Sequence, residues 1–135
     1  MFKTPMIILA GVVAFMLLPP AQADAIKDAL DGYRAEGVAS FDARAGARRW
    51  LENFTDAKTG KSINCATCHK QDLRQAGQHL RTLKPIEPMS PAINPQRLTD
   101  VKKIEKWFLR NCKGTWGREC TAQEKGDFLV YIQSQ

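Results

Sequence analysis

The stretch Cys65-Ala66-Thr67-Cys68-His69 decides how this 135-residue chain is interpreted. Two thiols three positions apart, followed at once by a histidine, form the C-x-x-C-H pattern of covalent haem attachment. Each thiol can form a thioether with one haem vinyl group, and the histidine then lies under the iron as its proximal ligand. A thioredoxin-like redox pair would not need the histidine, and a zinc site would need a second Cys/His pair. The pattern therefore predicts one covalent haem c held by Cys65, Cys68 and His69.

The N-terminus has the three parts of an export signal. Lys3 supplies a positive charge, residues 6–18 are continuously apolar, and small residues around Ala23 offer a cleavage site. The apolar run is shorter than the ~20 residues that a membrane-spanning helix needs. We expect residues 1–23 to be a signal peptide and residues 24–135 to form a monohaem cytochrome c domain in the periplasm. An uncleaved membrane anchor is the alternative.

The charge balance argues against nucleic acid as a partner. Removal of residues 1–23 takes away only one charged side chain, so 19 basic and 14 acidic ones remain, a net charge of +5. No dense basic patch with interleaved aromatic residues is present in the sequence. The small positive excess is compatible with steering toward an acidic redox partner.

The two cysteines outside the haem motif, Cys112 and Cys120, are expected to form a disulfide. The chain has four cysteines; haem attachment uses two of them, and an exported protein would oxidise the others. The loop that this disulfide closes is short, so chain entropy contributes only ~2.5 kcal/mol. We therefore expect the disulfide to fix the shape of this loop.

Apolar residues recur at helical spacing in four segments, and no alternating strand pattern separates them. The expected helices cover residues 24–36, residues 42–54, residues 99 or 100 to 111, and a last segment that begins at the capping box Thr121-x-x-Glu124. A long irregular stretch with four prolines lies between the haem motif and the third helix. Wrapping around a haem edge would explain its length. The pattern predicts an all-α domain.

This order resembles class I cytochrome c, which has an N-terminal helix, the haem motif, a wrapping loop, a further helix and a C-terminal helix. In that family a glycine and an aromatic residue four positions later pack on the last helix. Gly46 and Trp50 match the first pair, and Phe128 and Tyr131 match their partners. The resemblance implies a class I cytochrome c-like fold over residues 42–135, with residues 24–36 as an extra N-terminal helix and the disulfide in the distal loop.

The sixth iron ligand decides the function, and few side chains can supply it. After residue 23, Met89 is the only methionine and His79 the only other histidine. Class I cytochromes c take their methionine from the loop after the third helix, whereas Met89 precedes that helix, so we favour an apolar packing role for it. His79 follows His69 too closely to reach the opposite face of the haem. A plain low-spin electron carrier ligated by Met89 stays open as an alternative.

The segment around Cys112 carries a more specific resemblance. Arg110-Asn111-Cys112, then Gly117-Arg118-x-Cys120-Thr121, together with Arg-Thr-x-Lys-x-Ile-x-Pro at residues 81–88, is similar to the sphaeroides haem protein family of high-spin monohaem cytochromes c. The related cytochrome c double-prime proteins have a histidine where this chain has Asn111. In the sphaeroides family the asparagine before the first disulfide cysteine ligates ferric haem. The resemblance therefore implies that Asn111, at the expected end of the third helix, is the distal ligand.

An asparagine ligand would have a distinct chemistry. A carboxamide oxygen is a hard, neutral and weak donor, which suits ferric iron better than neutral ferrous haem. We therefore expect ferric iron that is high-spin or close to it, and release of Asn111 on reduction. The five-coordinate ferrous centre could then bind O2, NO or CO, and the freed amide could donate a hydrogen bond to dioxygen.

The resemblance implies gas binding together with electron exchange with another cytochrome, such as a dihaem cytochrome c. The remaining alternative is a small haem enzyme that acts on oxygen, nitric oxide or peroxide. We disfavour the enzyme because the chain has no distal histidine and no obvious acid–base group beyond Arg118 and Glu119.

Overall fold

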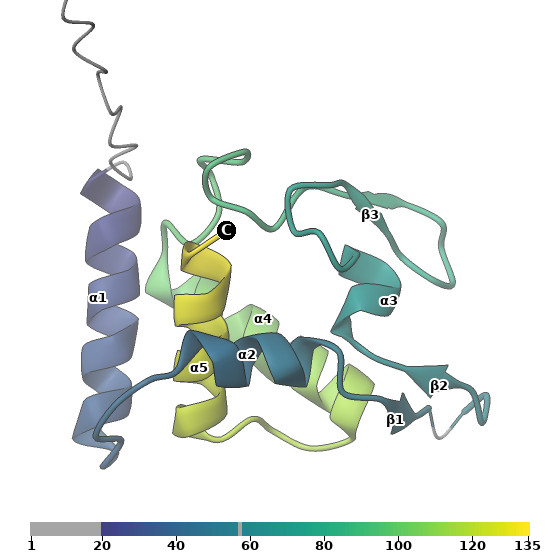
Figure 1. Cartoon of the computed structure of the whole chain (residues 1–135), viewed down its shortest axis with the longest axis horizontal. Coiled ribbons are helices and arrows are strands. Elements are labelled where there is room, and N and C mark those ends of the chain that lie inside the picture. Colours follow the sequence, from purple (N-terminus) through teal and green to yellow (C-terminus); the bar gives the residue numbers. More distant parts are fainter. Residues whose placement is uncertain (1–19, 57) are drawn as a thin grey trace, which may run out of the picture.

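The computed structural model describes residues 20–56 and 58–135. The elements of this part follow in the order α1 (Pro20–Ala35), α2 (Ala43–Trp50), β1 (Phe54–Thr55), β2 (Ser62–Ile63), α3 (Cys65–His69), β3 (Gly77–Gln78), β4 (Pro85–Ile86), α4 (Val101–Trp116) and α5 (Ala122–Gln133). Helices α2, α4 and α5 form the middle of the molecule, α1 stands along one side, and α3 lies with the short strands on the other (Figure 1). The molecule is therefore a helical domain, as the sequence predicts.

Helix α1 is the expected extra N-terminal helix, and it packs an apolar stripe on α4 and α5. The buried residues of this stripe share one face and meet Ile104 of α4 and Leu129 of α5; they are Ala25, Ile26, Ala29, Leu30 and Tyr33. The hydroxyl of Tyr33 donates a hydrogen bond to Glu105, which also pairs with Lys125 at 2.7 Å. Polar and apolar contacts thus hold α1 to the rest of the domain.

The start of α1 bears on the expected signal peptide. The helix begins at Pro20, four residues before the expected Asp24, so the expected cleavage point falls in its first turn. Residues 1–19, which contain the apolar run, lie outside the described residues. The signal peptide stays a prediction.

Helices α2 and α5 approach each other most closely at Gly46. A Cβ atom there would lie 2.2 Å from the backbone oxygen of Asp127 and 2.7 Å from the Cβ of Tyr131, so the contact has no room for a side chain. One turn later, Trp50 packs edge-on against Phe128 and Tyr131, with ring centroids 6.2 Å and 6.0 Å apart. The pairing that the class I resemblance implied is confirmed.

A buried carboxylate ties the beginning of α2 to the middle of α5. Asp127 is 2% exposed and accepts hydrogen bonds from the backbone N–H of Asp42, from Arg49 at 2.6 Å and from Gln123 at 2.8 Å. Both carboxylate oxygens are therefore satisfied, which a buried charge requires. This network fixes the position of α2 along the axis of α5.

Two expected helices end at different residues. Helix α2 stops at Trp50, not at Phe54, because Phe54 pairs with Ile63 in an antiparallel ladder. The helical domain also contains two short hairpins that no alternating pattern in the sequence marks: β1 pairs with β2, and β3 pairs with β4. These hairpins frame the haem motif, since β2 runs directly into α3 and β3 follows it.

We expected helix α4 to end at Asn111, but it continues to Trp116. The physical reason is an apolar repeat every four residues: Cys112 and Trp116 extend the face that Ile104 and Phe108 begin. Gly117 then ends the helix in the left-handed conformation, with φ of +69°. The expected distal loop is therefore mostly helix.

Candidate haem site

The haem motif forms α3, a short helix with its own cap. The side chain of Asn64 accepts from the backbone N–H of Thr67 at 2.9 Å, and the hydroxyl of Thr67 accepts from the backbone N–H of Asn64 at 2.9 Å. This reciprocal cap fixes the turn in which Cys65 and Cys68 occupy neighbouring positions of one face. Neither cysteine is in a disulfide. The turn thus presents two thiols at the spacing that two thioethers need.

His69 is held as a neutral imidazole against the core. Its ring centroid lies 5.6 Å from that of Trp50, whose indole N–H donates to the backbone oxygen of Lys70 at 2.9 Å. Burial and, to a smaller extent, the positive charge of Arg97 lower the pKa of His69 to about 4. The neutral ring is the form that binds a metal. Its Nδ1 is buried without a hydrogen-bond partner among the described residues.

The chain after α3 folds back and passes close to the backbone of α3 at Gly77. A Cβ atom on Gly77 would lie 2.0 Å from the backbone oxygen of Cys68, so only glycine allows β3 to pass there. His79 lies in the hairpin that follows, and its Nδ1 accepts from the backbone N–H groups of Arg81 and Thr82 at 3.3 Å and 3.2 Å. One ring nitrogen of His79 therefore holds the turn, which agrees with our expectation that His79 does not ligate the iron.

Met89 packs on the same core as the haem motif. This core, which we call the haem-side core, consists of the buried residues Trp50, Leu73, Cys112, Cys120, Phe128 and Ile132. Met89, Cys65 and Ala66 are partly buried against it. The position is compatible with the apolar role that we favour for Met89, and the Met-ligated alternative stays untested.

Asn111 lies inside α4 beside a disulfide. Cys112 is 6% exposed and bonded to Cys120, with their Cα atoms 5.6 Å apart, which confirms the expected pairing. Asn111, in contrast, is exposed. Its carboxamide therefore lies on a face of α4 that the packed core does not cover, on a backbone that is held by helix and disulfide together.

The end of α4 carries an arrangement that the sequence did not reveal. Trp116 packs between Phe54 and Phe128, with ring centroids 4.9 Å and 5.6 Å away, and the Arg118 guanidinium lies 4.9 Å over its ring. The same guanidinium binds both carboxylate oxygens of Glu124 at 2.7 Å and 2.8 Å. Trp116 therefore packs on the domain, against rings from β1 and α5.

Arg118 and Glu119, the two groups considered for acid–base chemistry, both form ion pairs. The hydrogen bond from Arg118 holds the pKa of Glu124 at about 2, against the opposing effect of burial. Glu119, the second group considered, pairs with Lys113 at 3.0 Å on the surface. Both Arg118 and Glu119 are therefore parts of ion pairs.

The side chains at α3 fit a haem. Two buried nitrogen atoms, Nδ1 of His69 and Nε1 of Trp116, lack hydrogen-bond partners among the described residues, and such atoms call for an explanation. A haem brings iron to an imidazole, apolar faces to aromatic rings and vinyl groups to two thiols. The neutral His69, the haem-side core and the paired thiols match these three requirements.

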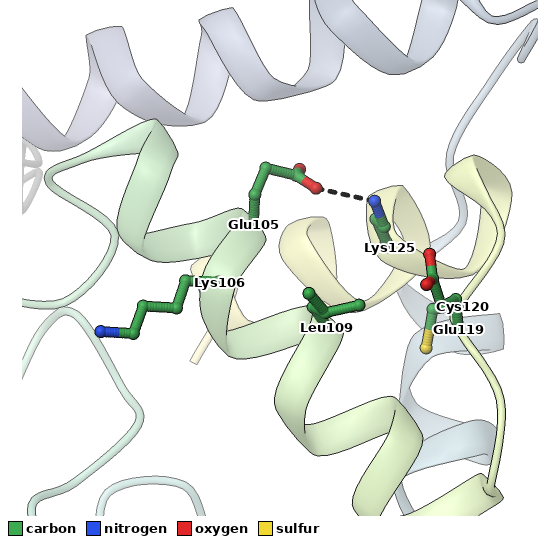
Figure 2. A pocket seen from close by; sticks show the side chains of 6 residues that line it. All are labelled: Glu105, Lys106, Leu109, Glu119, Cys120 and Lys125. Carbon is green, nitrogen blue, oxygen red and sulfur yellow. Dashed lines mark hydrogen bonds and ion pairs between the residues drawn. The ribbon is translucent and has the colours of Figure 1, made fainter.

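A hollow of about 240 Å³ lies between α4 and the start of α5 (Figure 2). Its walls are Glu105, Lys106, Leu109, Glu119, Cys120 and Lys125. None of them belongs to the haem motif, and the Glu105–Lys125 ion pair lies along one wall. This hollow is a surface feature separate from the candidate haem site.

Comparison with known proteins identifies the family. Residues 36–132 match the family described as "Domain of unknown function (DUF1924)". The chain is 39% identical over 126 residues to cytochrome c-type protein SHP of Cereibacter sphaeroides, a span of 92% of this chain and 96% of that protein. The chain belongs to the SHP family of c-type cytochromes. Its cofactor is therefore a covalently bound haem c.

Solved structures agree with this family. The structure of oxidised SHP, an oxygen-binding cytochrome c, matches with a TM-score of 0.73 and 38% identity over 82% of this chain and 96% of that chain. Oxidised cytochrome c″ from Methylophilus methylotrophus matches with a TM-score of 0.73 and 25% identity over 85% and 94%. By sequence, cytochrome c″ is 34% identical over 77 residues, 57% of this chain and 54% of that protein. The predicted SHP-like helical fold is confirmed.

In the part of this SHP-family chain that the structure describes, no helix has the length and apolar character needed to cross a membrane.

Proposed function

We propose that this SHP-family chain is an exported cytochrome in which Cys65 and Cys68 attach the haem, His69 is the proximal ligand, and Asn111 is a ferric-state ligand released on reduction. The observation that carries the proposal is the place of Asn111: an uncovered carboxamide inside α4, next to the buried half of the Cys112–Cys120 disulfide. When bound, the haem supplies reversible one-electron chemistry and a coordination position for a diatomic ligand.

The helix and the disulfide explain how a weak ligand could be held and still be released. The backbone of Asn111 is restrained, because it lies within α4 and precedes a cross-linked residue. Only the two side-chain torsions need to turn for the oxygen to leave the sixth position. A neutral oxygen donor favours ferric iron, so reduction weakens its bond and opens the position to O2, NO or CO.

The proposal extends to electron exchange and location. We place the domain, residues 24–135, in the periplasm, an oxidising compartment in which the disulfide is stable and c-type haem is attached. The partner would be another cytochrome, such as a dihaem cytochrome c, and the net charge of +5 expected for residues 24–135 favours an acidic surface on that partner.

The test compares Asn111→Ala with Met89→Leu in the ferric, haem-loaded protein. We expect Asn111→Ala to admit water at the iron and shift the absorption and electron paramagnetic resonance spectra. Met89→Leu should leave both spectra as in the wild type. A low-spin spectrum with a methionine–iron charge-transfer band, lost in Met89→Leu and kept in Asn111→Ala, would contradict the proposal and establish the plain electron carrier.

Two measurements on the wild type complete the test. The intact mass should equal the chain from about Asp24 plus one haem, which checks the signal peptide and the cofactor together. The ferrous protein should bind carbon monoxide rapidly, because its sixth position is open. Slow binding, limited by departure of an internal ligand, would contradict release of Asn111 on reduction.

A further inference from the structure

The neighbours of Asn111 on the surface of α4 can be named from helix geometry. Side chains three and four positions away lie beside a helical residue, with Cβ atoms about 5–6 Å apart. On the N-terminal side these neighbours are Trp107 and Phe108, and on the C-terminal side Gly114 and Thr115. Phe108 is committed to the core, where it stacks on Phe128 with ring centroids 6.3 Å apart. The other three neighbours border the uncovered face.

Trp107 is the unusual member of this group. It is 49% exposed, although a tryptophan normally buries its large apolar ring. It takes no part in the ring–ring contacts of the described residues, and the Arg110 guanidinium lies over its ring, 5.1 Å from the ring centroid. The indole is therefore positioned, since a guanidinium restrains it one turn from Asn111, but the helical core does not use it.

Gly114 leaves the opposite flank of Asn111 bare. A Cβ atom there would meet nothing within 4 Å. Glycine is among the poorest residues for a helix interior, and α4 gains no close helix contact from it. Asn111 thus stands between a large indole on one side and uncovered backbone on the other.

We infer that Trp107 is the specificity-determining side chain of the sixth coordination position, where its indole beside Asn111 limits the size of the ligand that reaches the iron. This inference rests on the proposed function, in which Asn111 occupies that position in the ferric state. A ligand that replaces the Asn111 carboxamide takes a place one helical turn from the indole. A diatomic molecule fits beside the ring, whereas a ligand with a side branch or a chain must displace it.

The experiment measures association rates of two probes with the ferrous, haem-loaded protein: carbon monoxide, which is small, and n-butyl isocyanide, which is bulky. Trp107→Ala should raise the isocyanide rate by about tenfold or more, in line with the discrimination that one shaped apolar wall provides. The carbon monoxide rate should change by less than about threefold. Trp107→Phe should give an intermediate isocyanide rate. The stretching frequency of bound carbon monoxide should also shift, which reports the distal surroundings independently of rates.

Leu109→Ala is the matched control. Leu109 is 42% exposed and on the same helix, but it lines the hollow between α4 and α5 (Figure 2). Its removal should leave both rates and the stretching frequency unchanged. The inference is overturned if Trp107→Ala behaves like Leu109→Ala, or if it changes the two probes equally.

The failure of the inference can be told apart from failure of the proposed function. If Asn111→Ala leaves the ferric spectrum unchanged, the ligand assignment is wrong, and the proposal for Trp107 falls with it. If Asn111→Ala shifts the spectrum while Trp107→Ala leaves the ratio of the two rates unchanged, the ligand assignment stands and only the role of Trp107 is refuted.

Discussion

Two regions of this molecule differ in how their buried side chains find contacts: the helical scaffold of α1, α2, α4 and α5, and the haem side around α3 and the haem-side core. In the scaffold, buried Asp127 accepts three hydrogen bonds, and Gly46 lets two helices touch. On the haem side, His69 and Trp116 each have a buried nitrogen without a partner among the described residues, and Trp107 is half exposed. The scaffold is therefore determined by contacts within the chain, whereas the haem side is arranged for a group that the chain must acquire.

The strongest test of the scaffold is Gly46→Val. Because an added Cβ would lie 2.2 Å from the backbone oxygen of Asp127, α2 and α5 must separate, and the Trp50 contacts one turn later loosen with them. We expect the free energy of unfolding of the haem-loaded protein to fall by about 3 kcal/mol, the upper range for an overpacked contact. Urea denaturation followed by circular dichroism measures it.

Gly32→Ala is the control for this substitution. A Cβ on Gly32 would meet nothing within 4 Å, and the residue lies in the last turn of α1. The variant should gain up to about 1 kcal/mol, because alanine is the better helix residue. If Gly46→Val were as stable as the wild type, the close contact between α2 and α5 would be wrong.

The second test connects the two regions, because the Cys112–Cys120 disulfide belongs to the haem-side core and adjoins Asn111. A double Cys→Ser variant should lose ~2.5 kcal/mol of stability. If the disulfide also positions Asn111, ferric ligation should loosen, and added anions such as azide should bind the ferric haem more tightly than in the wild type. Unchanged ferric spectra and azide affinity would show that the disulfide only holds the fold.

The same division explains what could be predicted from the sequence. Helix periodicity located all four long helices, and the capping box at Thr121 forms as expected, with Glu124 bonded to it in both directions. Local rules worked where local geometry decides the result. The pairing of Gly46 and Trp50 with α5 joins distant segments, and it was predicted from the family resemblance.

The errors arise where distant segments meet. Phe54 extended the apolar pattern of α2, but its partner is Ile63 across a hairpin, which periodicity cannot show. The true end of α4 could have been found, since Cys112 and Trp116 continue the repeat of Ile104 and Phe108. The Arg118–Glu124 pair over Trp116 had no such signal, because it depends on how α4 turns into α5.

A third, smaller effect is the pH-dependent stabilisation by the Arg118–Glu124 ion pair, where α4 turns into α5. Arg118 holds the pKa of Glu124 at about 2, below its usual 4.5, so the pair stabilises the folded state above pH 4.5. The contribution is lost as the pH falls from 4.5 toward 2. Glu124→Gln should lower the free energy of unfolding at pH 7 by about 1 kcal/mol, the usual value of a helix cap. It should also make this free energy depend less on pH between 4.5 and 2.

Glu119→Gln is the matched control, because Glu119 forms an exposed ion pair with Lys113, and such pairs contribute little. Thermal unfolding between pH 2 and pH 7 compares the two variants with the wild type. Equal slopes for Glu124→Gln and the wild type would mean that the Arg118 pair adds nothing to stability.

The smallest expected effect is that of Gly114→Ala, which should change both helix stability and ligand access. Gly114→Ala should stabilise α4 by about 0.5–1 kcal/mol, as Gly32→Ala does for α1, because neither added methyl group meets a neighbour. On the uncovered flank of Asn111, however, the methyl group narrows the space beside the sixth position, so association of n-butyl isocyanide with the ferrous protein should slow. Gly32→Ala should leave that rate unchanged. A gain in stability with no change in the rate would place Gly114 outside the ligand's path and leave Trp107 as the sole wall.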